Sequence, residues 1–234
     1  MDHFNYRNGQ LYAEDVSVAE IATSVGTPFY VYSTATLVRH FQLFDEALNG
    51  MDHCICYAMK AASNQAILKT LGNLGAGMDV VSGGEYRRAL SAGIPPEKVV
   101  FSGVGKTLEE ITLALKNGIR QFNVESDSEL EQISSIASSM DKIAPIAVRI
   151  NPDVDAQTHE KIATGKAENK FGIPLSRARE VYSKASQMPG INIVGIDLHI
   201  GSQLTDLKPF KKAYQKLADL TQVLRQDGHK IKRL

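Results

Sequence analysis

A single lysine, Lys60, follows a short apolar segment, residues 54–59, whose composition predicts a β-strand. Side chains alternate along a strand, so the small residues Cys54, Cys56 and Ala58 share one face with Lys60, and the bulkier residues share the other. If helices cover the bulky face, Lys60 emerges at the mouth of a crowded interior. A desolvated lysine has a lowered pKa, and its amine is then a nucleophile that condenses with a carbonyl group to form an imine.

Other polar residues follow the ends of later predicted strands: Asp79, Glu85, Arg149, His199, Gly201 and Ser202. Each has an ordinary structural explanation, such as a helix cap, a hydrogen-bonded histidine, or an ion pair between Arg149 and Asp79. Lys60 is harder to explain in that way, because burial of an unpaired lysine is unfavourable. Together the group indicates a phosphorylated cofactor that reacts with an amine, with Lys60 and His199 as candidate catalytic residues.

These side chains need a scaffold, and the hydrophobic pattern predicts strands and helices in regular alternation, which is typical of a parallel sheet. The predicted strands span residues 54–59, 76–81, 98–102, 121–125, 145–150 and 192–199, and a further one begins at 230–234. The predicted helices span 64–74, 84–92, 108–117, 128–140, 176–188 and 207–226. The pattern favours a (β/α)8 TIM-type barrel over an open doubly wound sheet, and it supplies fewer than the eight units that close a barrel.

The first 35 residues differ from this pattern and are predicted to form a separate N-terminal arm, with the barrel domain spanning 36–234. Asn8-Gly9 is a turn signal, and a short helix over 18–25 is expected to end at Gly26. Residues 27–32 predict a strand that begins with proline. A helix follows to about residue 48, capped by Ser33 or Thr34.

The long segment 151–174 separates the strand at 145–150 from its helix, and loops of this length are commonly binding loops, lids or disordered segments. Its polar and flexible residues favour an active-site lid, with four candidate positions: His159, Lys161, Thr164 and Gly165.

Composition excludes several other classes of protein. The formal net charge is zero and basic residues are not concentrated, so we expect no nucleic-acid partner. No apolar segment approaches the ~20 residues that span a bilayer. The two cysteines, Cys54 and Cys56, predict neither a disulfide framework nor a metal site, and free thiols favour a cytoplasmic location. The segment 103–107 ends like a phosphate-binding loop, but Val100 stands where that motif requires glycine.

From about residue 4 to its end, the sequence resembles diaminopimelate decarboxylase. The resemblance is carried by YAMKA at 57–61, DVVSGGE at 79–85, FNVES at 122–126, RINPDVD at 149–155, TH at 158–159, TG at 164–165, NKFG at 169–172 and HIGSQ at 199–203. It implies an alanine-racemase-like α/β barrel whose N-terminal arm belongs to a C-terminal β-domain that this chain lacks.

The resemblance also implies the cofactor and the site residues. Pyridoxal 5′-phosphate would be carried by the amine of Lys60, with His199 stacked on its ring and Gly201 and Ser202 at its phosphate. A polar network around Lys60 would comprise Asp79, Glu85 and Arg149. The segment 158–172 would belong to the substrate lid.

The implied reaction is decarboxylation of meso-2,6-diaminopimelate to L-lysine and carbon dioxide, the last step of lysine biosynthesis, by a homodimer whose active sites lie at its interface. The family's glycine-rich phosphate loop, its acidic cofactor partner, its substrate-binding arginines and its catalytic cysteine would lie beyond Leu234. We therefore expect the 234-residue chain to be inactive alone. Alternatives are a related ornithine or arginine decarboxylase, a non-catalytic pyridoxal-phosphate-binding barrel, and a scaffold without a ligand.

Overall fold

The first part of the chain forms a small antiparallel sheet. The computed structural model describes residues 2–154, 171–202 and 204–234. Strands β1 (Phe4–Arg7), β2 (Gln10–Ala13) and β3 (Val16–Ser17) pair in that order, and helix α1 (Val18–Val25) follows. The turn between β1 and β2 uses Asn8 and Gly9, both with positive φ (50° and 80°), which suits a tight hairpin. The predicted turn and the predicted helix over 18–25 are confirmed.

The predicted strand over 27–32 is wrong, because the structure has irregular backbone there. The apolar composition of this segment indicated a buried strand, but Tyr30 is 91% exposed and the segment pairs with no described strand. A strand requires a hydrogen-bonding neighbour, and local sequence cannot supply one. The next helix, α2 (Thr34–Ala47), agrees with its prediction, and the Ser33 hydroxyl caps it by accepting from the Thr36 N–H.

The main sheet is parallel. Its strands are β4 (Cys56–Ala58), β5 (Gly77–Val80), β6 (Val99–Phe101), β7 (Gln121–Val124), β8 (Ala144–Asn151) and β10 (Ile191–Leu198), and the short β9 (Ile173–Pro174) pairs with the end of β8. Neighbours in the sheet follow the order of the chain, from β4 at one edge to β10 at the other. A doubly wound sheet reverses this order at its switch point. The order therefore confirms the barrel type of α/β fold, in an open form.

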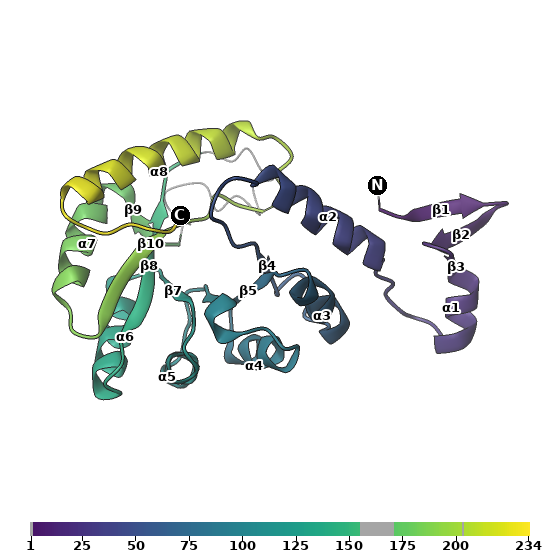
Figure 1. Cartoon of the computed structure of the whole chain (residues 1–234), viewed down its shortest axis with the longest axis horizontal. Coiled ribbons are helices and arrows are strands. Elements are labelled where there is room, and N and C mark those ends of the chain that lie inside the picture. Colours follow the sequence, from purple (N-terminus) through teal and green to yellow (C-terminus); the bar gives the residue numbers. More distant parts are fainter. Residues whose placement is uncertain (1, 155–170, 203) are drawn as a thin grey trace.

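Helices follow the strands and cover one side of the sheet, so that they form an arc outside the strands in Figure 1. They are α3 (Gln65–Asn73), α4 (Gly83–Ser91), α5 (Leu108–Asn117), α6 (Asp127–Ser139), α7 (Ala178–Gln187) and α8 (Lys208–Gln226), with short 3-10 turns at Pro96–Lys98 and Leu175–Arg177. The main core lies between helices and sheet, where Met78, Phe101 and Phe122 are fully buried. For the strand at 54–59, the predicted contact of the bulkier face with the helix-covered core is confirmed for Tyr57 and Met59.

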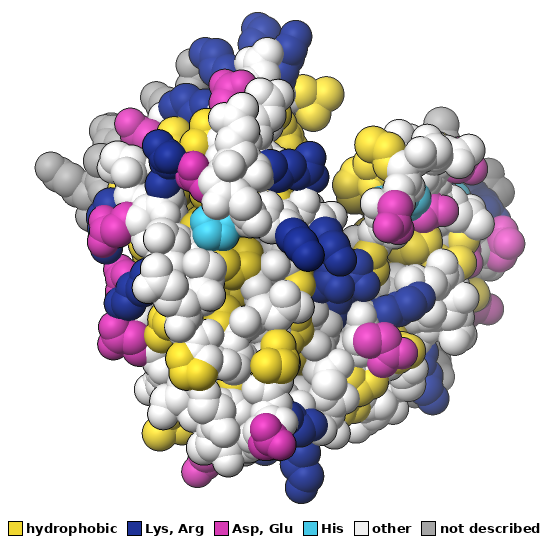
Figure 2. Space-filling model, turned by 60° about the vertical axis from the view of Figure 1, so that its left-hand side comes forward, with side chains coloured by type: hydrophobic (Ala, Val, Ile, Leu, Met, Phe, Trp, Pro, Cys, Tyr) yellow, Lys and Arg dark blue, Asp and Glu magenta, His cyan; other side chains and the backbone are white. Residues whose placement is uncertain are grey.

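At the far edge, the expected strand over 230–234 is reduced to one isolated parallel bridge, between Arg233 and Gly195 of β10. The edges β4 and β10 are not paired with each other. None of the helices in the described residues has the length and apolarity to cross a membrane. The face drawn in Figure 2 carries both acidic and basic side chains, in keeping with the zero net charge.

Candidate functional site

Strand register brings polar residues together on the inner face of the sheet. Arg149 of β8 lies directly opposite Asp197 of β10. Val124 of β7 lies opposite Val148, so Glu125, the next residue, arrives beside Arg149. All three residues lie at the C-terminal end of the sheet, which is where barrel enzymes have their active sites.

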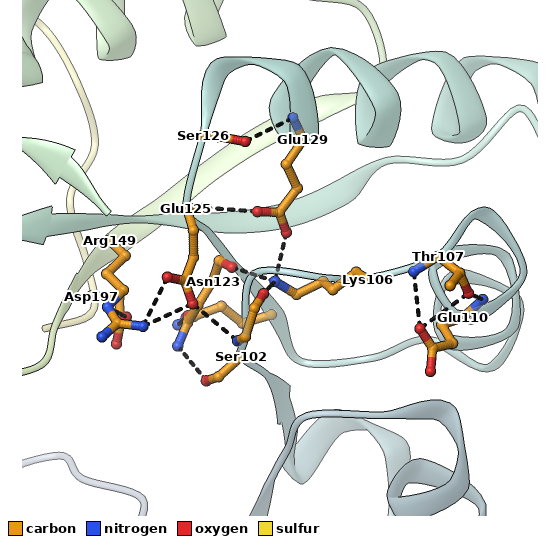
Figure 3. A network of polar contacts seen from close by, with 12 residues as sticks. Ser102, Lys106, Thr107, Glu110, Asn123, Glu125, Ser126, Glu129, Arg149 and Asp197 are labelled. Carbon is orange, nitrogen blue, oxygen red and sulfur yellow. Dashed lines mark hydrogen bonds and ion pairs between the residues drawn. The ribbon is translucent and has the colours of Figure 1, made fainter. Parts of the chain in front are cut away.

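Arg149 and Glu125 form the central ion pair of this site. The Arg149 Nη1 donates to both Glu125 carboxylate oxygens at 2.8 Å, and the Glu125 side chain is only 2% exposed. Glu125 also accepts from the Gly103 N–H at 3.0 Å, and the Arg149 Nε lies 4.0 Å from Asp197. The partners of Arg149 are therefore Glu125 and Asp197, whereas the sequence suggested Asp79. Figure 3 shows this contact at one end of a longer network.

Asp79, near the end of β5, belongs to a chain of hydrogen bonds that joins the network of Figure 3 at Ser102 and Asn123. The Ser102 hydroxyl donates to Asp79 at 2.6 Å, the Asn123 amide donates to Ser102 at 3.1 Å, and Gln121 donates to Asn123 at 2.8 Å. Burial raises the pKa of the Asp79 carboxyl, while Ser102 and the charge of Lys60 oppose this shift. Asp79 is thus held in place by its hydrogen bond to Ser102 on the neighbouring strand, and the charge of Lys60 is close enough to lower its pKa.

Lys60 follows β4 by two residues and is exposed, whereas the sequence predicted a desolvated amine. The physical reason is the position of β4 at the edge of the sheet, where no strand shields its other side. The amine still lies within the electrostatic reach of two predicted site residues, because the charge of Lys60 lowers the pKa of both Asp79 and His199.

His199 directly follows β10, the opposite edge strand, and is also exposed. Desolvation of its imidazole, followed by the charges of Arg149 and Lys60, lowers its pKa to about 4. The ring is therefore neutral at physiological pH. Gly201 has a φ of 132°, which L side chains rarely adopt, and the exposed Ser202 follows it.

Glu85 has a capping role in this structure. Its carboxylate accepts from the Val81 N–H at 2.9 Å, and its own N–H donates to the Ser82 hydroxyl at 3.2 Å. These contacts close the first turn of α4. Glu85 therefore stabilises the turn after β5, and no hydrogen bond or ion pair to Asp79 or Arg149 is found among its described contacts.

Sequence reasoning missed four residues of the inner face: Ser102, Asn123, Glu125 and Asp197. Burial raises the pKa of the Asp197 carboxyl to about 6, with Arg149 opposing the shift. A signal for three of them was available, because Asp197 is two residues from His199, and Asn123 is two residues from Glu125, so each pair shares one face at the end of its strand.

Lys106 extends the network behind the site (Figure 3). Its side chain is 1% exposed and its ammonium donates to Glu129, to the Gly103 carbonyl and to the Asn123 carbonyl at 2.5 to 2.7 Å. Glu129 in turn accepts from the Glu125 N–H at 2.8 Å. Lys106 thus braces the backbone on both sides of Glu125, and all its contacts are internal, which agrees with rejecting a phosphate loop at 103–107.

The four lid candidates, His159, Lys161, Thr164 and Gly165, lie outside the described residues. Within the residues that the structure does describe, no group of His, Cys, Asp and Glu side chains could hold a metal ion.

Comparison with known proteins decides the family. The model of the pyridoxal-dependent decarboxylase family, for its pyridoxal-binding domain, matches residues 34–234. The chain belongs to the pyridoxal-dependent decarboxylases. The cofactor of this family is pyridoxal 5′-phosphate.

Individual relatives refine this result. A diaminopimelate decarboxylase of Haemophilus influenzae is 53% identical over the whole of this chain, which spans 56% of that protein. The Helicobacter pylori diaminopimelate decarboxylase, solved with L-lysine, is 45% identical with a TM-score of 0.87, covering 92% of this chain and 54% of that one. A lysine decarboxylase of Selenomonas ruminantium is more distant, at 25% identity and a TM-score of 0.80, covering 92% and 53%. This chain spans about half the length of these decarboxylases.

The residues present fit pyridoxal phosphate. An exposed amine, Lys60, could hold its aldehyde, and the neutral His199 offers a flat ring within electrostatic reach of that amine. Gly201 provides a backbone without a side chain at the same end of the sheet, where a phosphate can approach closely. The donor set therefore agrees with the cofactor of the family.

Proposed function

We propose that the protein to which this chain belongs decarboxylates meso-2,6-diaminopimelate to L-lysine and carbon dioxide. The observation that carries the proposal is the 53% identity with a diaminopimelate decarboxylase over all 234 residues. The distant lysine decarboxylase shares half as much identity, so ornithine- or lysine-type substrates are less well supported. The Helicobacter pylori relative was solved with L-lysine, the product expected here.

Each inner-face residue receives a role in this proposal. Lys60 holds pyridoxal phosphate, which supplies an electron sink for the bond to the leaving carboxylate when it is bound. His199 presents an uncharged ring to the cofactor at neutral pH, because its pKa is about 4. Gly201 and Ser202 contribute to the phosphate site.

The Arg149–Glu125 pair orients the wall of the pocket. Because the Arg149 guanidinium is fixed by Glu125 and faces Asp197, it keeps positive charge near His199 and disfavours protonation of the imidazole. Asp79 faces the same interior and senses the charge of Lys60. Glu85 contributes by holding the turn that follows Asp79.

The proposal extends to further parts of the protein. The segment that contains His159, Lys161, Thr164 and Gly165 would be a substrate lid. Residues 1–35 would form an arm of a β-domain, and 36–234 the barrel domain. We further propose a cytoplasmic homodimer with active sites at the interface, in keeping with the two free thiols for its location.

The test joins this chain to the remaining C-terminal segment of the Haemophilus influenzae relative and supplies pyridoxal phosphate. We expect L-lysine and carbon dioxide from meso-diaminopimelate, and far less product from ornithine, arginine or lysine. Lys60→Ala should abolish both turnover and the visible absorbance of lysine-bound cofactor, and Lys69→Ala, an exposed lysine on α3, should change neither. Preferential turnover of ornithine would overturn the substrate, and unchanged absorbance in Lys60→Ala would overturn the cofactor site.

A further inference from the structure

The two cysteines of the chain lie side by side at the N-terminal end of β4, away from the candidate site. Their sulfur atoms are 3.9 Å apart. Cys56 opens β4 opposite Gly77, and the Gly77 N–H donates to the Ile55 carbonyl at 2.9 Å, so the backbone between the cysteines is extended. Both side chains therefore point to the same, inner face of the sheet.

Glycine at position 77 makes room for this pair. A Cβ built there would meet the Cys56 sulfur at 2.9 Å and the Lys98 carbonyl at 2.2 Å. Cys54 and Cys56 are both half-buried in this chain.

Three cations interact electrostatically with the sulfurs: Lys98, Arg120 and Arg233. Lys98 donates to the Gly75 carbonyl and Arg233 donates to the Arg120 carbonyl, which gathers these side chains around the N-terminal ends of the strands. Their charges and that of Arg120 act on the thiols, and Asp79 is the acidic group that opposes them at Cys56. An electropositive and partly accessible setting is typical of reactive cysteines.

The two thiols differ in acidity. A hydrogen bond from Cys56, assisted by Arg120 and Lys98, lowers the pKa of Cys54 to about 6. The same hydrogen bond, burial and the nearby charges of Cys54 and Asp79 raise the pKa of Cys56 far above its ordinary value. The two shifts have opposite directions, so Cys54 is the more acidic thiol of the pair.

We propose that Cys54 and Cys56 form a dithiol that hydrogen peroxide oxidises, with Cys54 as the attacking sulfur and Cys56 as the resolving one. The Cys54 thiolate attacks one peroxide oxygen, the O–O bond breaks, and hydroxide leaves to give a sulfenic acid. The Cys56 sulfur then attacks the Cys54 sulfur, the S–S bond forms, and the S–O bond breaks. The Cys56 proton leaves with the oxygen as water, so two thiols lose two electrons and one peroxide is reduced to two waters.

The resulting disulfide is readily reversible. Residues two apart in an extended strand have Cα atoms separated by about 6.6 Å, close to the upper limit of ~6.8 Å for a disulfide. Strained disulfides have high reduction potentials and are the labile ones. Reduced glutathione should therefore return the chain to its reduced form, whereas a structural disulfide resists reduction by glutathione.

Intact-mass analysis of the purified chain after peroxide treatment tests the proposal without cofactor or turnover. These two cysteines are the only ones in the chain, so every thiol product is assigned to this pair. The wild type should lose about 2 Da and regain them with dithiothreitol. Cys56→Ser should stop at the sulfenic acid, which dimedone traps, and Cys54→Ser should react at least about tenfold more slowly.

A second measurement needs no cysteine variant. Alkylation of the folded wild type by iodoacetamide should modify Cys54 first, with a rate that rises around pH 6, and Arg120→Gln should move this rise to higher pH. Unfolding in urea should remove the difference between the two thiols. Equal reactivity of both thiols in the folded chain, or peroxide products that lack the 2 Da loss, would overturn the proposal.

Discussion

Two lysines near the C-terminal end of the sheet show how different surroundings give one residue type different roles. Lys106 lies between β6, β7 and α6, where strands flank it, and its ammonium contacts Glu129 and two backbone carbonyls. Lys60 follows the edge strand β4 and remains exposed. The buried Lys106 ammonium has all three donors occupied and no access to a ligand, so its role is to stabilise the fold. An amine that reaches solvent beside Asp79 and His199 can bind a cofactor.

The largest expected difference comes from removing each ammonium. Lys106→Met leaves the Glu129 carboxylate buried without its partner, which should lower the free energy of unfolding by about 3–5 kcal/mol. Lys60→Met changes an exposed side chain and should alter it by less than about 0.5 kcal/mol. Urea denaturation followed by circular dichroism measures both. Similar losses in the two variants would contradict the distinction between the bracing lysine and the reactive one.

A smaller difference is expected between two glutamates that lie beyond the C-terminal ends of β7 and β5. Glu125→Gln weakens the contact with Arg149 and should cost about 1.5–3 kcal/mol, because hydrogen bonds to charged groups are the stronger ones. Glu85→Gln keeps an acceptor for the Val81 N–H and should cost about 0.5 kcal/mol or less. The same denaturation experiment compares the two variants. Equal losses in the free energy of unfolding would show that the Glu125–Arg149 contact contributes no more than a helix cap.

The smallest effects concern two histidines, the exposed His199 and the half-buried His53, and NMR titration of their ring protons measures them. Desolvation and two cations lower the pKa of His199 to about 4, whereas hydrogen bonds to the Met51 carbonyl and to Asp45 raise the pKa of His53. The two should therefore titrate on opposite sides of 6.5. A His199 resonance that titrates near pH 6.5 would show that desolvation and the two cations do not lower its pKa.

The sign of the associated stability change is also opposite for the two rings. Unfolded His199 binds more protons than the folded form between about pH 6.5 and 4, so it lowers stability as the pH falls through that window. His53 stabilises the folded chain below about pH 6.5, and this contribution disappears as the pH rises through its raised pKa. The variant Arg149→Met should move the His199 pKa upward, because it removes the cation that disfavours protonation of the imidazole more strongly than Lys60 does.

Local patterns were read correctly wherever the deciding interaction lies within a few residues. Helix α5 spans the predicted residues 108–117, because the Thr107 hydroxyl and the Glu110 carboxylate form a capping box and Gly118 ends the helix with a φ of 79°. Residues 27–32 and 230–234 failed as strands because pairing partners lie far away in sequence. Asp197 was missed because it lies outside the motifs that carry the resemblance, and Glu125 because its contact with Arg149 depends on the register of β7 and β8.

The sequence by itself determined the alternation of strands and helices, the inner and outer faces of each strand, and the lysine, histidine and glycine that suit pyridoxal phosphate. Only the tertiary structure decided that Arg149 pairs with Glu125 and Asp197, that Lys106 is a brace, and that Lys60 is exposed. The physical reason is register. Side-chain alternation is a property of one strand, whereas the partner of a charged group depends on how neighbouring strands align and on which strand lies at an edge.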